Sequence, residues 1–64
     1  MSYGLFKAIE NSAREEWRAL CRQRGYAQAA SRQGDTRTAA MWQTYSQRHA
    51  HTLRTLLRLR GEYR

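Results

Sequence analysis

Apolar residues recur at helix spacing on both sides of one short break, and this pattern restricts what the chain can fold into. The first series is Phe6, Ile9, Ala13, Trp17, Leu20, Ala27 and Ala30, and the second is Ala39, Trp42, Tyr45, His49, Leu53, Leu56, Leu59 and Tyr63. Spacings of three, four or seven place side chains on one face of an α-helix. The chain has no proline, and nowhere does it alternate as a strand would. The pattern predicts an all-α protein.

The break itself has the chemistry of a tight turn between two helices. Gly34 suits the left-handed residue that follows a helix, and Asp35 or Thr36 suits the N-cap of the next one. We therefore predict a helix over about 5–32, a turn at 33–35 and a helix over about 36–60, which form an antiparallel helical hairpin in a single domain, 1–64. Residues whose numbers add to about 69 then lie at the same height along the hairpin.

Two features of the first helix leave an alternative open. Ser12 and Glu15 have the spacing of a capping box, which marks helix starts. Gly25 costs a helix about 1 kcal/mol relative to alanine and favours a kink or a break there. Three shorter helices are therefore the alternative to the hairpin.

The stock of large aliphatic side chains is small for a 64-residue chain. It comprises six leucines, one isoleucine and no valine, with a single phenylalanine beside them. A domain of this size buries only about 60% of its unfolded surface, so a single hairpin has marginal stability. We expect the core to be completed by self-association, as a homo-oligomer, or by docking on a larger complex.

Basic residues dominate the charge. Twelve Lys and Arg oppose five acidic residues, for a net charge of +7, which indicates an acidic partner. Arg14, Arg18 and Arg22 are spaced by four, and Arg54 and Arg58 repeat this spacing. Arginines at this pitch form ridges that can bind successive phosphates, since a guanidinium contacts phosphate through two hydrogen bonds.

The aromatic residues divide into two groups. Trp17, Trp42 and Tyr45 lie on the apolar stripes and are expected in the core. Tyr3, Tyr26 and Tyr63 lie near the ends or near Gly25, and they are candidates for partner contact, because tyrosine is enriched at binding hot spots.

No pattern of catalytic or metal-binding residues is present. His49 and His51 are two apart, so they point away from each other on a helix and cannot share a zinc ion. In the hairpin register Cys21 would lie close to His49, but no third residue orients such a pair. We expect His49 to be a polar core residue, and we predict no enzyme activity, no metal and no cofactor.

These features together favour a small, non-enzymatic binding protein. The unpaired Cys21 suits a reducing compartment, no stretch resembles a signal peptide or a membrane span, and we expect a cytoplasmic protein. The leading prediction is a regulator that engages nucleic acid through its arginine ridges. The alternative is a compact inhibitor or adaptor, of the type that phages and plasmids encode, which docks on an acidic surface of a larger protein or nucleoprotein complex.

Overall fold

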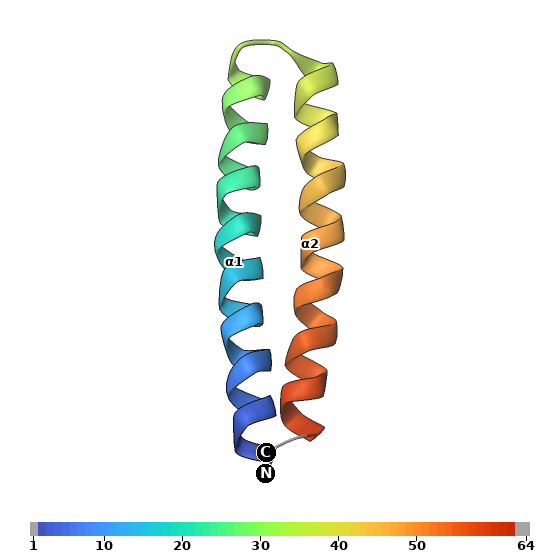
Figure 1. Cartoon of the computed structure of the whole chain (residues 1–64). Helices are drawn as coiled ribbons and strands as arrows, with labels where there is room; N and C mark the ends of the chain where they lie inside the picture. Colours follow the sequence, from blue (N-terminus) through green and yellow to red (C-terminus); the bar gives the residue numbers. More distant parts are fainter. Residues whose placement is uncertain (1, 63–64) are drawn as a thin grey trace.

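Two long helices joined by a tight turn make up the protein. The computed structural model describes residues 2–62, in which α1 spans Ser2–Arg32 and α2 spans Thr36–Glu62 (Figure 1). The helices run antiparallel along a rod of 50 × 14 × 10 Å, so the start of α1 and the end of α2 lie at one end of the rod. The predicted all-α helical hairpin and its turn at 33–35 are confirmed, and both helices extend further toward the termini than predicted.

Helix α1 runs without interruption through Ser12 and Gly25, so the alternative of three shorter helices is wrong. Gly25 is exposed, and a Cβ atom added there would meet nothing within 4 Å. Its cost in the helix is therefore limited to backbone entropy, about 1 kcal/mol. Packing against α2 on both sides of Gly25 outweighs this cost.

The turn has the hydrogen bonds of a Schellman motif. The N–H of Asp35 donates to the carbonyl of Ala30 (2.9 Å), and the N–H of Gly34 donates to that of Ser31 (3.0 Å). Gly34 has a φ of 76°, in the left-handed region where a side chain is unfavourable. The chain can therefore reverse direction at this residue with only three residues between the helices.

The two glycines provide a matched pair of predictions. Gly34→Ala is expected to lower the free energy of unfolding by about 1–2 kcal/mol, because alanine is strained at positive φ. Gly25→Ala is expected to raise it by about 0.5–1 kcal/mol, because the site is an open helix interior. Urea denaturation followed by circular dichroism measures both. Effects of the same sign at both positions would contradict the assignment of Gly34 to the turn.

Asp35 caps the N-terminus of α2. Its Oδ1 accepts a hydrogen bond from the backbone N–H of Thr38 at 3.1 Å, as an N-cap aspartate does. Hydrogen bonds from the side chain of Thr38 and, to a smaller extent, from its backbone N–H lower the pKa of Asp35. The cap is therefore strongest when Asp35 is ionised.

This lowered pKa predicts an acid-sensitive contribution to stability. An unfolded aspartate has a pKa of about 3.9, so the contribution is present above this pH and is lost as the pH falls through the lower folded pKa. Asp35→Asn is expected to keep the cap but lose this pH dependence, whereas Asp35→Ala loses the cap at every pH. Thermal melting of the three proteins over roughly pH 2–6 tests this. A melting difference between wild type and Asp35→Asn that stays constant over this range would contradict it.

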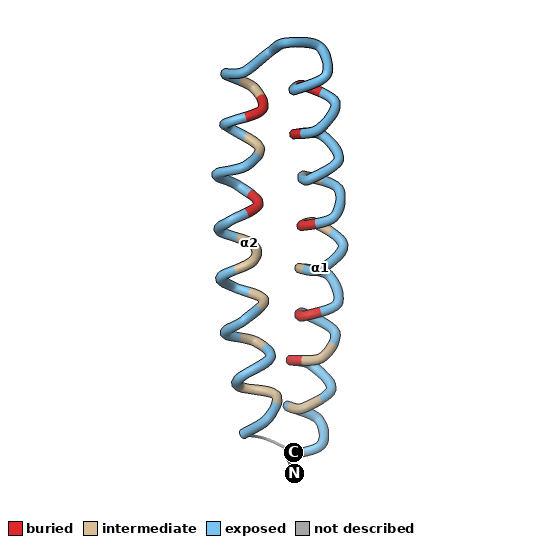
Figure 2. The backbone as a smooth tube through the Cα atoms, turned by 180° about the vertical axis from the view of Figure 1, so that it is seen from behind, coloured by how far each residue is buried: buried red, intermediate tan, exposed pale blue. Residues whose placement is uncertain are grey.

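Most buried and half-buried residues follow a repeat of three and four on the facing sides of both helices (Figure 2), and five further half-buried residues lie beside it: Glu10, Ala19, Thr38, Ala50 and Leu59. The residues of the repeat form the seam of the hairpin, which comprises Phe6, Ile9, Ala13, Glu16, Leu20, Gln23, Ala27 and Ala30 in α1 and Ala39, Trp42, Ser46, His49, Leu53, Leu56 and Arg60 in α2. This is the heptad pattern of a coiled coil. Tyr26 and Trp42 lie in contact, which agrees with the predicted register.

Trp17 and Tyr45 were expected in the core, and this prediction is wrong. Their side chains are 51% and 38% exposed and flank the seam. The neighbouring Glu16 and Ser46 hold the seam positions instead. A continuous coiled-coil repeat requires positions 16 and 46 to be on the seam whatever their polarity. The prediction followed apolar character alone and therefore chose the adjacent residues, Trp17 and Tyr45.

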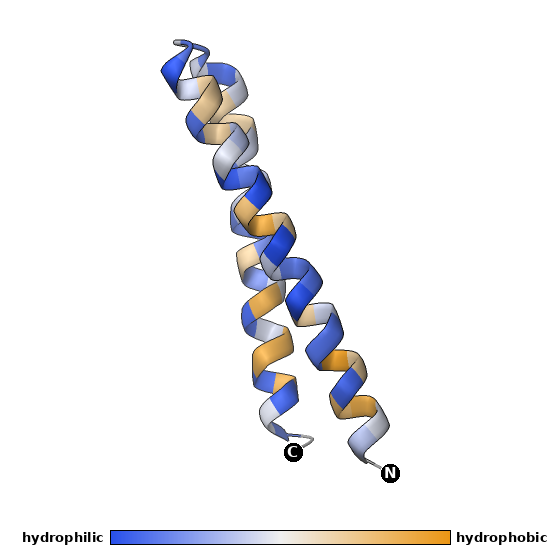
Figure 3. Cartoon of the chain, turned by 90° about the vertical axis from the view of Figure 1, so that its left-hand side faces the viewer, coloured by the Kyte–Doolittle hydropathy of each residue, from blue (hydrophilic) through white to orange (hydrophobic). Residues whose placement is uncertain are grey.

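The two ends of the rod differ in composition. We call residues 18–51 the turn half, and residues 2–17 with 52–62 the open half. All but one of the eight leucine, isoleucine and phenylalanine residues lie in the open half: Leu5, Phe6, Ile9, Leu53, Leu56, Leu57 and Leu59. Figure 3 shows this concentration of hydrophobic residues toward the termini. In the turn half the buried seam residues are mostly alanine, with Leu20 and Ser46.

Candidate nucleic-acid interface

The five arginines predicted to form ridges are all exposed: Arg14, Arg18, Arg22, Arg54 and Arg58. They do not share one surface. Arg18 lies midway between two seam residues of α1, and Arg58 lies midway between two of α2. On helices with about 100° per residue, both therefore lie on the outer sides of the hairpin and point in opposite directions. One straight ligand cannot contact both ridges along their full length.

Few of the positive charges are compensated. Within residues 2–62, the ion pairs connect Glu10 with Lys7 (3.3 Å) and with Arg60 (3.9 Å), and Glu16 with His49. Of the ten arginines in this range, nine therefore have no carboxylate within 4.0 Å. The exposed Lys7–Glu10 pair contributes little to stability, and most guanidinium groups remain available to a ligand.

The uncompensated charge is concentrated in the turn half. Six arginines lie there against a single acidic residue, Asp35, which leaves a net charge of +5. The open half has five basic residues and four glutamates between residues 2 and 62, a net charge of +1. The positive potential is therefore strongest in the turn half, where carboxylates are nearly absent.

An aromatic cluster lies on one side of the turn half. The ring of Trp42 contacts Tyr26 from α1, with ring centroids 5.0 Å apart, and Tyr45 from α2, at 5.8 Å. The guanidinium of Arg48 lies 5.8 Å from the centre of the Tyr45 ring, a cation–π distance. Trp42 is half-buried, whereas Tyr26 and Tyr45 are 49% and 38% exposed. The cluster joins the helices and leaves two tyrosine rings accessible.

Arg22 completes this side of the hairpin, because it precedes Tyr26 by four residues and so lies beside it on α1. We call Arg22, Tyr26, Tyr45 and Arg48 the tyrosine face. The sequence pattern indicated Arg22 and Tyr26 as binding residues. It did not indicate Arg48, and it predicted Tyr45 in the core. Tyr45 and Arg48 are three residues apart, a spacing that places both on one face of α2. With the heptad phase known, this spacing would have predicted that they share a surface.

The tyrosine candidate Tyr3 lies elsewhere. Tyr3 is 71% exposed in the first turn of α1, in the open half. Tyr63 lies outside the described residues. Of the two tyrosine candidates within residues 2–62, the structure associates Tyr26 with an arginine-rich surface and Tyr3 with the open half.

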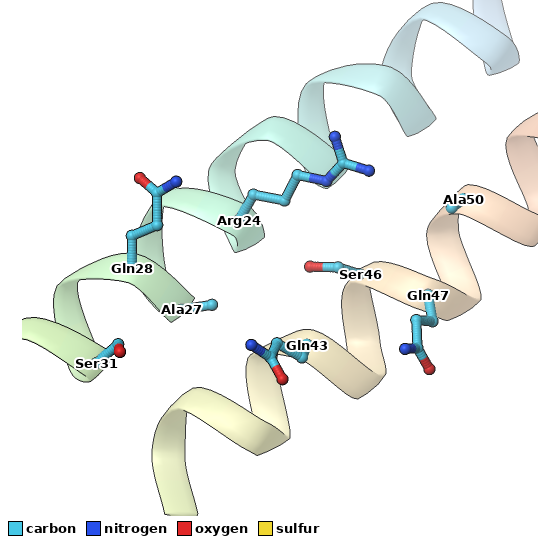
Figure 4. Close-up of a pocket in the computed structure, with 8 residues that line it drawn as sticks. All are labelled: Arg24, Ala27, Gln28, Ser31, Gln43, Ser46, Gln47 and Ala50. Carbon is cyan, nitrogen blue, oxygen red and sulfur yellow. The ribbon is translucent and has the colours of Figure 1, made fainter. Parts of the chain in front are cut away.

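A polar groove runs along the opposite side of the turn half. It has a volume of about 420 Å³ and is lined by Arg24, Ala27, Gln28, Ser31, Gln43, Ser46, Gln47 and Ala50. Figure 4 shows Ala27 and Ser46 pointing between the helices and Gln28 pointing away from α2. The Ser46 hydroxyl donates to the carbonyl of Trp42 at 2.8 Å. Amides and one arginine can donate hydrogen bonds to a polar ligand here, but no acid or base lines the groove for catalysis.

A second groove lies on the same side in the open half. This terminal groove has a volume of about 300 Å³ and is lined by Glu10, Ala13, Arg14, Trp17, Leu53, Leu57 and Arg60. Its floor is apolar and its charged residues carry both signs. It therefore differs in character from the basic turn half.

His49 is a half-buried seam residue, as predicted, and its Nδ1 contacts the Glu16 carboxylate of α1. This contact joins two polar seam residues across the hairpin. Cys21 is exposed, and the side-chain partner of His49 within residues 2–62 is Glu16 and not this thiol. Across residues 2–62, no three His, Cys, Asp or Glu side chains converge to hold a metal ion.

Neither described helix has a stretch long and apolar enough to cross a membrane. Among known proteins, the chain matches no family model, no curated protein and no solved structure.

Proposed function

We propose that the protein is a non-enzymatic, cytoplasmic regulator that binds nucleic acid, with the arginines of the turn half as its main phosphate contacts. One observation carries this proposal: six arginines against one aspartate in the turn half, none of them in an ion pair within residues 2–62. A surface of this kind binds a polyanion by releasing its counterions. Arginine also grips each phosphate through two hydrogen bonds.

The tyrosine face supports a preference for single strands. Unpaired bases stack on exposed aromatic rings, and each stacked base contributes about 1–3 kcal/mol to binding. Tyr26 and Tyr45 present two such rings, and Arg22 and Arg48 lie beside them to contact the flanking phosphates. Stacking and phosphate contacts read little sequence. The proposed activity is therefore single-strand binding with weak sequence preference.

The two predicted ridges contribute unequally in this proposal. Arg14 has Glu10 four residues before it, and Arg58 has Glu62 four residues after it, so an acidic neighbour reduces the local potential at each. Arg22 has no acidic residue at these spacings and lies on the tyrosine face. We therefore assign Arg14 and Arg58 a supporting role.

The test is binding of short labelled oligonucleotides, single- and double-stranded, measured by fluorescence anisotropy over a salt series. We expect the logarithm of affinity to fall linearly with the logarithm of salt, by about 0.7 per phosphate contacted on a single strand. We also expect tighter binding to single strands, and Tyr26→Ala to reduce this preference.

No binding at low salt would overturn the proposal and favour the inhibitor or adaptor that docks on an acidic protein. Such a protein would depend on a few anchoring residues and show a shallow response to salt. Its partner would co-purify in fixed stoichiometry after nuclease treatment.

A further inference from the structure

The terminal groove is an apolar surface that the hairpin does not cover. Trp17 is 51% exposed and Leu57 is 42% exposed, and they line the groove together with Ala13 and Leu53. Large apolar side chains at this exposure, gathered around one depression, are typical of a contact with another molecule.

The hairpin has more accessible surface than a compact monomer of its mass, and the excess is about the area that each partner buries in a dimer interface. Its accessible surface is 5043 Å², against about 4,300 Å² for a compact monomer of its mass. Its radius of gyration is 14.7 Å, against about 11 Å for a compact chain of this length. The excess of about 700 Å² is close to the roughly 800 Å² that each partner buries in a standard interface. Within residues 2–62, no large side chain is less than 2% exposed.

The charges favour a second copy of the chain as the occupant. The open half is almost neutral, whereas the turn half has a net charge of +5. Two copies can therefore approach through their open halves with little repulsion, provided that the turn halves stay apart. The rim of the groove has one carboxylate, Glu10, and two guanidinium groups, Arg14 and Arg60. Under a two-fold rotation, the acid of each copy can meet a base of the other.

We propose that the protein is a two-fold symmetric dimer in which the open halves pack through their terminal grooves and the turn halves point in opposite directions. Trp17 and Leu57 of each copy are buried against the other. The two turn halves remain accessible to nucleic acid, one at each end of the dimer. This proposal does not depend on nucleic-acid binding, because it concerns a different half of the molecule.

Analytical ultracentrifugation over a wide concentration range tests the association, with a matched pair of variants. Leu57 and Met41 have nearly equal exposure, 42% and 41%, but Met41 lies in the turn half, outside the groove. We expect a dimer whose dissociation constant rises more than about tenfold in Leu57→Gln and changes little in Met41→Gln. Circular dichroism confirms that each variant is helical. A monomeric wild type, or greater sensitivity to Met41→Gln, would overturn the proposal.

The relative orientation of the two copies is tested by pulsed electron spin resonance. Cys21→Ser combined with Gln33→Cys places one spin label at the turn of each copy. With a two-fold axis near Ala13 and Leu57, the helix rise puts the two labels about 60 Å apart or more. A distance below about 30 Å would place the turns together and exclude the arrangement. If the dimer forms as proposed but no oligonucleotide binds, only the proposed function fails.

Discussion

Replacing Arg22, Arg24 and Arg48 with glutamine is expected to weaken single-strand binding about 100-fold at roughly 0.1 M salt. Each lost phosphate contact lowers the slope of log affinity against log salt by about 0.7, so three lost contacts lower it by about 2. If wild type and variant bind equally at about 1 M salt, their affinities therefore differ about 100-fold at roughly 0.1 M. The three side chains are exposed and have no ion pair within residues 2–62. Glutamine is a good helix former, so the fold is expected to persist. Fluorescence anisotropy across a salt series measures both affinity and slope.

The matched control replaces three arginines of the open half, Arg14, Arg54 and Arg58, with glutamine. The change in net charge is the same, but we expect a smaller loss of affinity, because these residues lie in the open half, where four glutamates reduce the positive potential. Equal losses in the two triple variants would mean that binding follows net charge alone. The turn half would then have no special role in the contact.

Leu20→Ala is expected to have the largest effect on stability of any single substitution in the turn half. Leu20 is 3% exposed and is the only leucine, isoleucine or valine in that half. Removal of a buried leucine side chain costs about 2–5 kcal/mol, depending on how far the site collapses. The adjacent seam residues of α1 are Glu16 and Gln23, which are polar, so no aliphatic side chain next to Leu20 on this helix can fill the space. We expect loss of most helical signal at room temperature, as measured by circular dichroism and urea titration.

Leu5→Ala is the control for this prediction. Leu5 is 46% exposed at the other end of the hairpin, and a change at an exposed site is usually worth less than about 0.5 kcal/mol. Comparable destabilisation by the two substitutions would show that the seam around Leu20 is not the main source of stability.

Local features of the sequence determined the two helices and the turn. The absence of proline, the apolar repeat, Gly34 and Asp35 act over a few residues, and each has its predicted role in the structure. The net charge and the separation of aliphatic from basic residues are likewise properties of the sequence. They acquire a location only because the hairpin brings residues 18–51 to one end of the rod.

The packing of α1 on α2 decided which face of each helix is covered. The seam includes Glu16 and Ser46 and leaves out Trp17 and Tyr45, because two long helices that wind gently around each other stay in contact along an unbroken repeat of three and four. That choice left Trp17 over the terminal groove and Tyr45 on the tyrosine face. Hydrophobicity acts on each residue separately, whereas the phase of a seam is a property of both helices together. The candidate surfaces could therefore be located only in the tertiary structure.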